Sequence, residues 1–203
     1  SIVAARILAP HDLGLMGIHV TGAVAWGIWF YYCVTGDLDT IVEGGIDVLV
    51  KICRFWLSRV YYRPEHDDYA INQVLGPDEY HQGVDNNFYT NALACDNLLK
   101  TVRLLALLKE QRPEDYAAVA ERLRIRDAEI ERFAEIADKI YLPQDPEHDY
   151  HLQDDHFHRL EPYDLRTFPV EGALNQVWSY DRIMRTRLLR QADVLVADLL
   201  FGD

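Results

Sequence analysis

Apolar residues recur at the spacing of an α-helix along almost the whole of this 203-residue chain. A period of 3.6 residues gathers them on one face of a helix, whereas the strict alternation that marks a half-buried strand is scarce. Hydrophobic residues make up 49% of the chain, which is enough for a sizeable core. The pattern therefore predicts an all-α protein, with roughly six helices and no sheet.

Residues 20–34 (VTGAVAWGIWFYYCV) are apolar on every side, which is typical of a fully buried helix. The second predicted helix is capped by Asp39 or Thr40, and the third begins near Asn86 or Asn87. The apolar spacing places the later helices at about 40–60, 87–110, 113–123, 128–140 and 184–201. The inner side of the second helix is expected to carry Ile46, Leu49, Val50, Cys53, Phe55 and Trp56. Long irregular loops are expected at residues 61–85 and 141–170.

The formal net charge of −13 restricts the classes of partner that are expected for the chain. Such a surface repels nucleic-acid phosphates and anionic lipids, so neither nucleic acid nor membrane is expected as a partner. Cys33, Cys53 and Cys95 form no CxxC pair and lie in apolar contexts, which fits buried, reduced thiols. No apolar run reaches the ~18 residues of a membrane span and no signal peptide is seen, so a cytoplasmic location is expected.

The densest cluster of polar side chains lies in VLGPDEYHQGVDNNFYTNALA, residues 74–94. Gly76-Pro77 and Gly83 predict two bends that flank Glu79 and hold its carboxyl group in one place, as a general acid requires. Burial or neighbouring negative charge raises the pKa of such an acid, and Asp78 and Asp85 are sources of that charge.

Two other interpretations of this cluster stay open. One is an acidic, solvated loop followed by a helix that Asp85 or Asn86 caps. The other is a metal site made by His81 and the nearby acids, although no HExxH or similar helical spacing is present.

The run GPDEYHQGVDNNFYTNALA resembles the signature of glycoside hydrolase family 65, which includes maltose, trehalose, kojibiose and nigerose phosphorylases and some trehalases. HVTGAVAWGIWFYYCVTGD, RFWLSRV, HLQDDHFHRLEPYDL and LLRQADVLVADLLFGD are similar to further segments of the family and follow in its order. The resemblance covers nearly the whole chain. It implies an all-α fold, the (α/α)6 barrel, with residues 1–203 as a fragment that supplies about half of this catalytic domain.

The resemblance also implies a reaction and its residues. Glu79 matches the family's general acid, and Arg190 and Gln191 match a Lys-Gln pair that binds the transferred glucosyl unit. Inorganic phosphate is the co-substrate: it attacks the anomeric carbon of an α-linked glucose disaccharide and gives β-glucose 1-phosphate with inversion. Phosphate is itself a nucleophile, so no second carboxylate, metal or cofactor is expected. A family-like homodimer is one possibility for the full-length protein.

Arg190 departs from the family's lysine, and arginine is a planar, longer donor that is not equivalent at a tight sugar site. The alternative for Arg190 is an ordinary surface cation. His19 is a weaker candidate for a sugar contact, since a histidine that opens a helix is usually structural. Trp178 is a candidate for stacking on a sugar, whereas Trp26, Trp29 and Trp56 have the spacing of core residues.

A complete barrel of this kind has further segments that the chain does not contain. The family's Trp-Asp-Thr-Glu segment is expected before Ser1, and its serine-rich phosphate-binding segment after Asp203. The fragment alone is therefore expected to be inactive and to expose apolar helix faces. A hydrolase of the same family, similar to an acid trehalase, and an inactive helical scaffold are the alternative functions.

Overall fold

The computed structural model describes residues 16–167 and 174–201 of the chain, which forms two compact units. The first, called here the helical unit, comprises His19–Ile71 and Asn91–Tyr141. The second, the loop unit, is described over residues 16–18, 72–90, 142–167 and 174–201. Each unit is considered by itself below.

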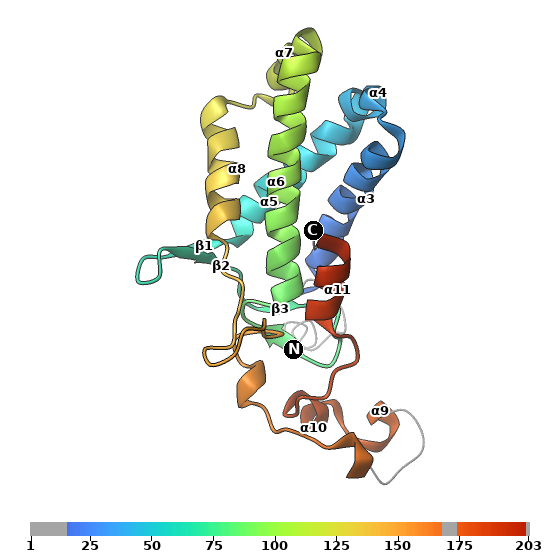
Figure 1. Cartoon of the computed structure of the whole chain (residues 1–203), viewed down its shortest axis with the longest axis vertical. Helices are drawn as coiled ribbons and strands as arrows, with labels where there is room; N and C mark the ends of the chain where they lie inside the picture. Colours follow the sequence, from blue (N-terminus) through green and yellow to red (C-terminus); the bar gives the residue numbers. More distant parts are fainter. Residues whose placement is uncertain (1–15, 168–173, 202–203) are drawn as a thin grey trace, which may run out of the picture. The chain divides into compact units, whose positions relative to one another are not determined.

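Helices make up most of the helical unit, as the apolar spacing predicts. They are α3 (His19–Thr35), α4 (Leu38–Thr40), the π-helix η1 (Ile41–Gly45), α5 (Ile46–Arg59), α6 (Phe88–Gln111, whose first turn belongs to the loop unit), α7 (Pro113–Leu123) and α8 (Asp127–Lys139). Within this unit α6 lies between α3 and α8 (Figure 1). Gly22 of α3 comes close to Leu93, and the Cys95 thiol donates to the carbonyl of Ala137 at 3.2 Å.

The core of the helical unit is centred on α5 and α6. The inner positions predicted for α5 are buried, with the exception of Phe55, which is half-buried. The Trp56 indole, fully buried, donates to Oδ1 of Asn97 on α6 at 3.0 Å. Arg54 forms a bidentate pair with Glu129 on α8 and also donates to the carbonyl of Leu123 at the end of α7. One guanidinium thus ties three helices together.

The second helix starts two or three residues earlier than predicted. Asp37, not Asp39 or Thr40, is the N-cap, since its Oδ1 accepts the Thr40 amide at 3.1 Å. Leu38–Thr40 and the π-turn Ile41–Gly45 then lead into α5. A widened π-turn changes the phase of the helix, which apolar spacing alone does not reveal.

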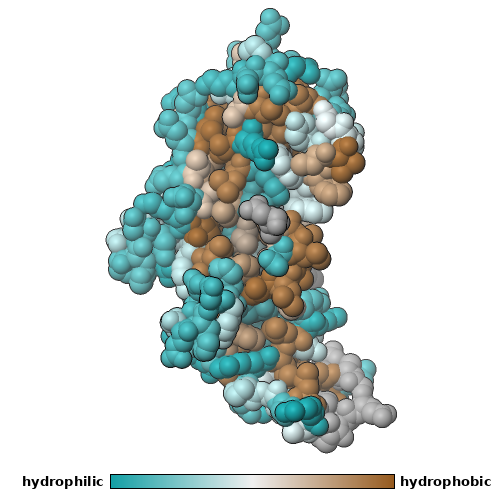
Figure 2. Space-filling model, in the orientation of Figure 1, coloured by the Kyte–Doolittle hydropathy of each residue, from teal (hydrophilic) through white to brown (hydrophobic). Residues whose placement is uncertain are grey.

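The prediction that residues 20–34 form a fully buried helix is wrong for this chain. Of α3, only Gly22 and Ala25 are buried, whereas Val20 and Val34 are 63% and 70% exposed. Cys33 is exposed as well, against the prediction, while Cys53 is buried and Cys95 half-buried. Among the described residues α3 has neighbours on one side only. In Figure 2, hydrophobic residues accordingly reach the surface between the hydrophilic ones.

Two short antiparallel hairpins correct the expectation of a chain without any sheet. In the helical unit β1 (Tyr61–Arg63) pairs with β2 (Asp68–Ala70), and in the loop unit β3 (Val74–Leu75) pairs with β4 (Gln82–Val84). Strands of two or three residues are too short for alternation to be recognised in a sequence.

The rest of the described loop unit is largely irregular, as predicted for residues 141–170, of which 168–170 lie outside the described residues. It contains the 3₁₀ turns η2 (Phe157–Arg159) and η3 (Leu165–Thr167) and the short helices α9 (Leu174–Val177), α10 (Tyr180–Met184) and α11 (Asp193–Phe201). The last helix was expected from about residue 184, but it begins at Asp193 because residues 185–192 bridge to Glu161 and form bends. Across the parts of the chain that the structure describes, no helix is both long and apolar enough to cross a membrane.

Candidate active site

The candidate site lies within the loop unit, on the loop that joins β3 to β4. Gly76 opens this loop in a confined place: a Cβ there would lie 2.5 Å from Nδ2 of Asn87 and closer still to Oδ2 of Asp193. Gly83 adopts a left-handed conformation, with a φ of 65°, which suits glycine at the second predicted bend. The loop therefore turns tightly and packs against distant parts of the chain.

Asp78 points into the protein. It is 1% exposed, and its carboxylate accepts hydrogen bonds from the Arg190 amide at 2.9 Å, from Nδ1 of His81 at 2.6 Å and from Nε2 of Gln153 at 3.3 Å. The sequence assigned to Asp78 the role of a charge beside Glu79. The structure instead gives that carboxylate a full set of donors of its own, as a buried charge requires.

The His81 ring lies between two oxygen atoms. Its Nδ1 is 2.6 Å from Oδ2 of Asp78, and its Nε2 is 2.9 Å from the carbonyl oxygen of Thr186. Burial disfavours the charged ring, but the hydrogen bonds to Asp78 and Thr186 outweigh it and raise the pKa of His81. Since both ring nitrogens are hydrogen-bonded, the metal alternative finds no vacant ligand atom on His81.

Asp193, the first residue of α11, is a second buried carboxylate of this site. It is fully buried, and it accepts the Asp78 amide at 2.8 Å and Nδ2 of Asn87 at 2.7 Å. Burial raises the pKa of Asp193 to about 7; the charges of Asp78 and Asp154 act in the same direction, and the hydrogen bond from Asn87 opposes them. Asp193 was not among the predicted site residues, although it lies within RQADV, residues 190–194.

Glu79 points the opposite way from Asp78. Its side chain is 54% exposed, and its carboxylate pairs with the guanidinium of Arg190, which is 46% exposed. The Glu79 amide faces Oε1 of Gln191 at 3.5 Å. The structure therefore brings Glu79, Arg190 and Gln191 together from positions more than a hundred residues apart. Arg190 and Gln191 lie in the bend before α11, not on a helix.

The helix cap differs from the prediction. Asn87 caps α6, because its Oδ1 accepts the Thr90 amide at 3.0 Å. Asp85 instead accepts the Gln73 amide at 3.0 Å, and so closes the β3–β4 hairpin. Asp85 is therefore not the acid at the start of the helix, and neither expected source of charge points at Glu79.

Trp178 and His19 are the remaining predicted site residues. Trp178 is half-buried; its ring meets Tyr163 edge-on at 5.0 Å, and the Arg182 guanidinium lies 4.8 Å from it. Tyr163 in turn helps to line an open pocket of about 440 Å³ in the loop unit, which also includes Tyr80, next to Glu79. His19 is the first residue of α3 in the helical unit, so it belongs to the other unit.

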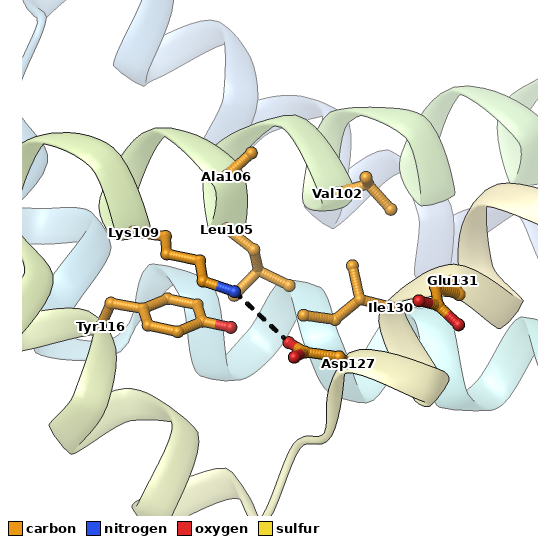
Figure 3. Close-up of a pocket in the computed structure, with 8 residues that line it drawn as sticks. All are labelled: Val102, Leu105, Ala106, Lys109, Tyr116, Asp127, Ile130 and Glu131. Carbon is orange, nitrogen blue, oxygen red and sulfur yellow. Dashed lines mark ion pairs between the residues drawn. The ribbon is translucent and has the colours of Figure 1, made fainter.

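The helical unit has a pocket of its own, of about 350 Å³, between α6, α7 and α8 (Figure 3). Its floor is apolar, with Leu105 and Ile130, and the Lys109–Asp127 ion pair crosses its mouth at 3.6 Å. Both partners of this pair are more than half exposed, so water screens it strongly. None of the predicted site residues lines this pocket.

This mostly helical chain thus brings a carboxylate beside a guanidinium and an amide within its loop unit. The sequence matches the glycosyl hydrolase family 65 central catalytic domain over residues 9–203, and the chain belongs to that family. It therefore forms part of an (α/α)6 barrel.

Several proteins that the chain is similar to are named as phosphorylases of disaccharides. The chain is 35% identical over 192 residues to a kojibiose phosphorylase of Thermoanaerobacter brockii, and 37% identical over 190 residues to a maltose phosphorylase of Bacillus subtilis. These alignments cover 91% and 92% of the chain and 24% of each relative. A solved structure of a human-microbiome protein assigned as a kojibiose phosphorylase matches 89% of the chain and 25% of its own, with a TM-score of 0.78 and 26% identity. The chain thus spans about a quarter of the length of these relatives.

Proposed function

We propose that this chain supplies the proton donor and part of the sugar site of an inverting phosphorylase that cleaves an α-linked glucose disaccharide to β-glucose 1-phosphate and a free sugar. The observation that carries the proposal is the meeting of Glu79 with Arg190 and Gln191 within the loop unit. The names of the relatives, which are kojibiose, maltose and trehalose phosphorylases, support the substrate class.

In the proposed reaction Glu79 gives its proton to the glycosidic oxygen as the bond to the leaving sugar breaks. Inorganic phosphate forms the new bond at the anomeric carbon from the opposite face, so the configuration inverts. Phosphate arrives as an anion and needs no protein base, which removes the second carboxylate that an inverting hydrolase uses. No cofactor takes part in this scheme.

Arg190 and Gln191 are the proposed contacts of the transferred glucosyl unit. A guanidinium offers a planar set of donors, and an amide offers both a donor and an acceptor, so together they match neighbouring sugar hydroxyl groups. Trp178, whose ring meets Tyr163 of the pocket that Tyr80 also lines, is proposed to stack on a sugar. The phosphate site is assigned to polypeptide that the relatives have in addition to the matched quarter.

Half of the Glu79 side chain is exposed, which favours the proposal that the isolated chain is inactive. A general acid must carry its proton until the bond breaks, and an enclosed, water-poor surrounding provides for this. We propose that polypeptide corresponding to the other three quarters of the relatives' length encloses Glu79 in the active enzyme.

The test is a chimera in which residues 9–203 replace the matched segment of the Thermoanaerobacter brockii kojibiose phosphorylase. The chimera and the isolated chain are assayed for glucose 1-phosphate release from a panel of α-linked glucose disaccharides, with and without phosphate. We expect release from the chimera only, strictly dependent on phosphate, and a loss of about a thousandfold in Glu79→Gln. Glu147→Gln, which changes an exposed acid of the same unit, is the control.

Each contrary result has a distinct meaning. Sugar release that continues without phosphate would identify a hydrolase of the family. Wild-type rates in Glu79→Gln would assign the proton donor to another residue. Phosphorolysis by the isolated 203 residues would contradict the proposal that the chain works only as part of a larger barrel.

A further inference from the structure

The two buried carboxylates of the loop unit are connected in a reciprocal way. Oδ1 of Asp193 accepts the backbone amide of Asp78 at 2.8 Å. Oδ1 of Asp78 accepts the backbone amide of Arg190 at 2.9 Å, and the amide of Gln191 lies 3.5 Å from the same oxygen. Each carboxylate therefore accepts a hydrogen bond from a main-chain amide of the segment that carries the other carboxylate.

Gln153 joins the same two segments through its side-chain amide. Its Oε1 accepts the Asp193 amide at 3.1 Å, while its Nε2 lies 3.3 Å from Oδ2 of Asp78 and 3.4 Å from the carbonyl of Gln191. Gln153 is 4% exposed, so these bonds are made away from water. Main-chain atoms on both sides of the Glu79–Arg190 pair are thus held by buried side chains.

We propose that Asp193 is a positioning residue, and that Asp193 and Asp78 form a reciprocal carboxylate clamp which fixes the main chain at Glu79 against the main chain at Arg190 and Gln191. The effect of the clamp on catalysis rests on the proposed function, whereas the hydrogen bonds that form the clamp do not depend on that function. Glu79 is flanked by Asp78 on one side, and Arg190 and Gln191 precede Asp193 by three and two positions. The clamp therefore acts one to three residues away from each group that it positions.

A carboxylate at position 193 is specifically suited to this task. Both of its oxygens accept hydrogen bonds, one from the Asp78 amide and one from Nδ2 of Asn87 at 2.7 Å. An asparagine of the same shape would keep one acceptor but would set its own NH₂ group against that of Asn87.

This geometry provides a rescue experiment. In Asp193→Asn, two amide donors face each other. In the double variant Asn87→Asp with Asp193→Asn, the direction of that hydrogen bond is reversed, and the net charge of the buried group is conserved. The cap of α6 would survive the Asn87→Asp change, since an aspartate accepts the Thr90 amide as the asparagine does. Asp198→Asn, an exposed acid on the same helix, is the control.

The first measurement is amide hydrogen exchange in the 203-residue chain, read by mass spectrometry of peptides that contain Asp78 or Arg190, at a protein concentration below that at which the chain self-associates. We expect Asp193→Asn to lower the protection of the Asp78 and Arg190 amides by about tenfold or more, because a buried donor is left unsatisfied. The double variant should return both to within about threefold of wild type, and Asp198→Asn should leave them unchanged. Amides of α5 and α8, in the helical unit, serve as the internal reference.

Three outcomes would overturn the clamp. Protection of Asp78 and Arg190 that survives Asp193→Asn would show that Asp193 does not hold them. An equal fall at the reference amides, or a failure of either variant to fold, would make Asp193 a general stability residue. If the Asp78 and Arg190 amides are as poorly protected in the double variant as in Asp193→Asn, the proposed reversal of the hydrogen bond between positions 87 and 193 is wrong.

The second measurement separates the clamp from the proposed function. In the chimera, Asp193→Asn should lower kcat by about a hundredfold with KM changed less than about threefold, since misplacing a reacting group by about 1 Å has an effect of this size. The double variant should recover most of kcat. If the chimera shows no phosphorolysis while the exchange data follow the expected pattern, the proposed function fails and the clamp stands. If kcat is unaffected, Asp193 has no positioning role.

Discussion

Adjacent residues of one sequence motif have opposite surroundings here. Asp78 is buried among five donors, while Glu79, the next residue, is half-exposed beside a guanidinium. The sequence predicted Glu79, Arg190 and Gln191 as site residues, and the structure brings the three close together, but the sequence did not show which acid faces inward. That assignment depends on Asp193, which lies 115 positions away from Asp78, so local pattern could not supply it.

The buried ionisable groups predict how stability depends on pH. The pKa of Asp193 is raised from 3.8 to about 7, so the folded chain holds a proton that the unfolded chain releases between about pH 4 and pH 7. Stability from this group is therefore present at acid pH and is lost as the pH rises to about 7. His81 also has a raised pKa, and its contribution is lost in the same direction. Asp145, whose pKa the Glu147 amide and the His148 side chain lower to about 2, titrates below this window.

We expect the free energy of unfolding to be higher at pH 5.5 than at pH 8, and the difference to shrink in Asp193→Asn. Urea denaturation at a series of pH values measures both. A free energy of unfolding that rises from pH 5.5 to pH 8 would show that the burial of Asp193 does not control its titration.

At the scale of the elements, periodicity located the buried faces well and the boundaries less well. The inner residues of α5 follow from their spacing because α5 packs on one side only, which is what an amphipathic pattern encodes. The start of α11 was missed because residues 185–192 have the apolar and basic composition of a helix, yet Glu161 and Asp78 bind their main chain and hold it in bends. The two β-hairpins were not predicted because they form through hydrogen bonds between paired strands, which the composition of each short strand does not reveal.

Two glycine-to-alanine substitutions are expected to act in opposite directions. Gly76→Ala places a methyl group against Asp193 and Asn87 and should destabilise the chain by about 1–3 kcal/mol. Gly27→Ala, in the exposed middle of α3, meets nothing within 4 Å and should stabilise it by about 0.5–1 kcal/mol. Thermal or urea unfolding of both variants beside wild type provides the measurement. Equal effects of the two would contradict the close packing around Gly76.

At the scale of the whole molecule, helices in both units leave large apolar side chains exposed to solvent. α3 carries no charged residue and leaves Val20, Val24, Phe30, Tyr31 and Val34 exposed. α11, in the other unit, leaves Leu195 and Leu199 at 69% and 83% exposure. The family relation explains why such faces persist, since the matched relatives are about four times as long as the aligned part. In a closed barrel every inner helix has neighbours on both sides.

These faces predict self-association of the isolated chain despite its net charge of −13. We expect sedimentation or light scattering to show oligomers at micromolar concentration, and Val20→Glu with Leu199→Glu to shift them toward the monomer. In the chimera the same pair of substitutions should instead lower the stability, because there the additional polypeptide would bury both positions and a buried, unpaired carboxylate is costly. If the two substitutions make the isolated chain more monomeric but lower the stability of the chimera, the exposed faces of α3 and α11 are covered in the larger protein. Equal effects in both would mean that α3 and α11 stay open to solvent in the larger protein as well.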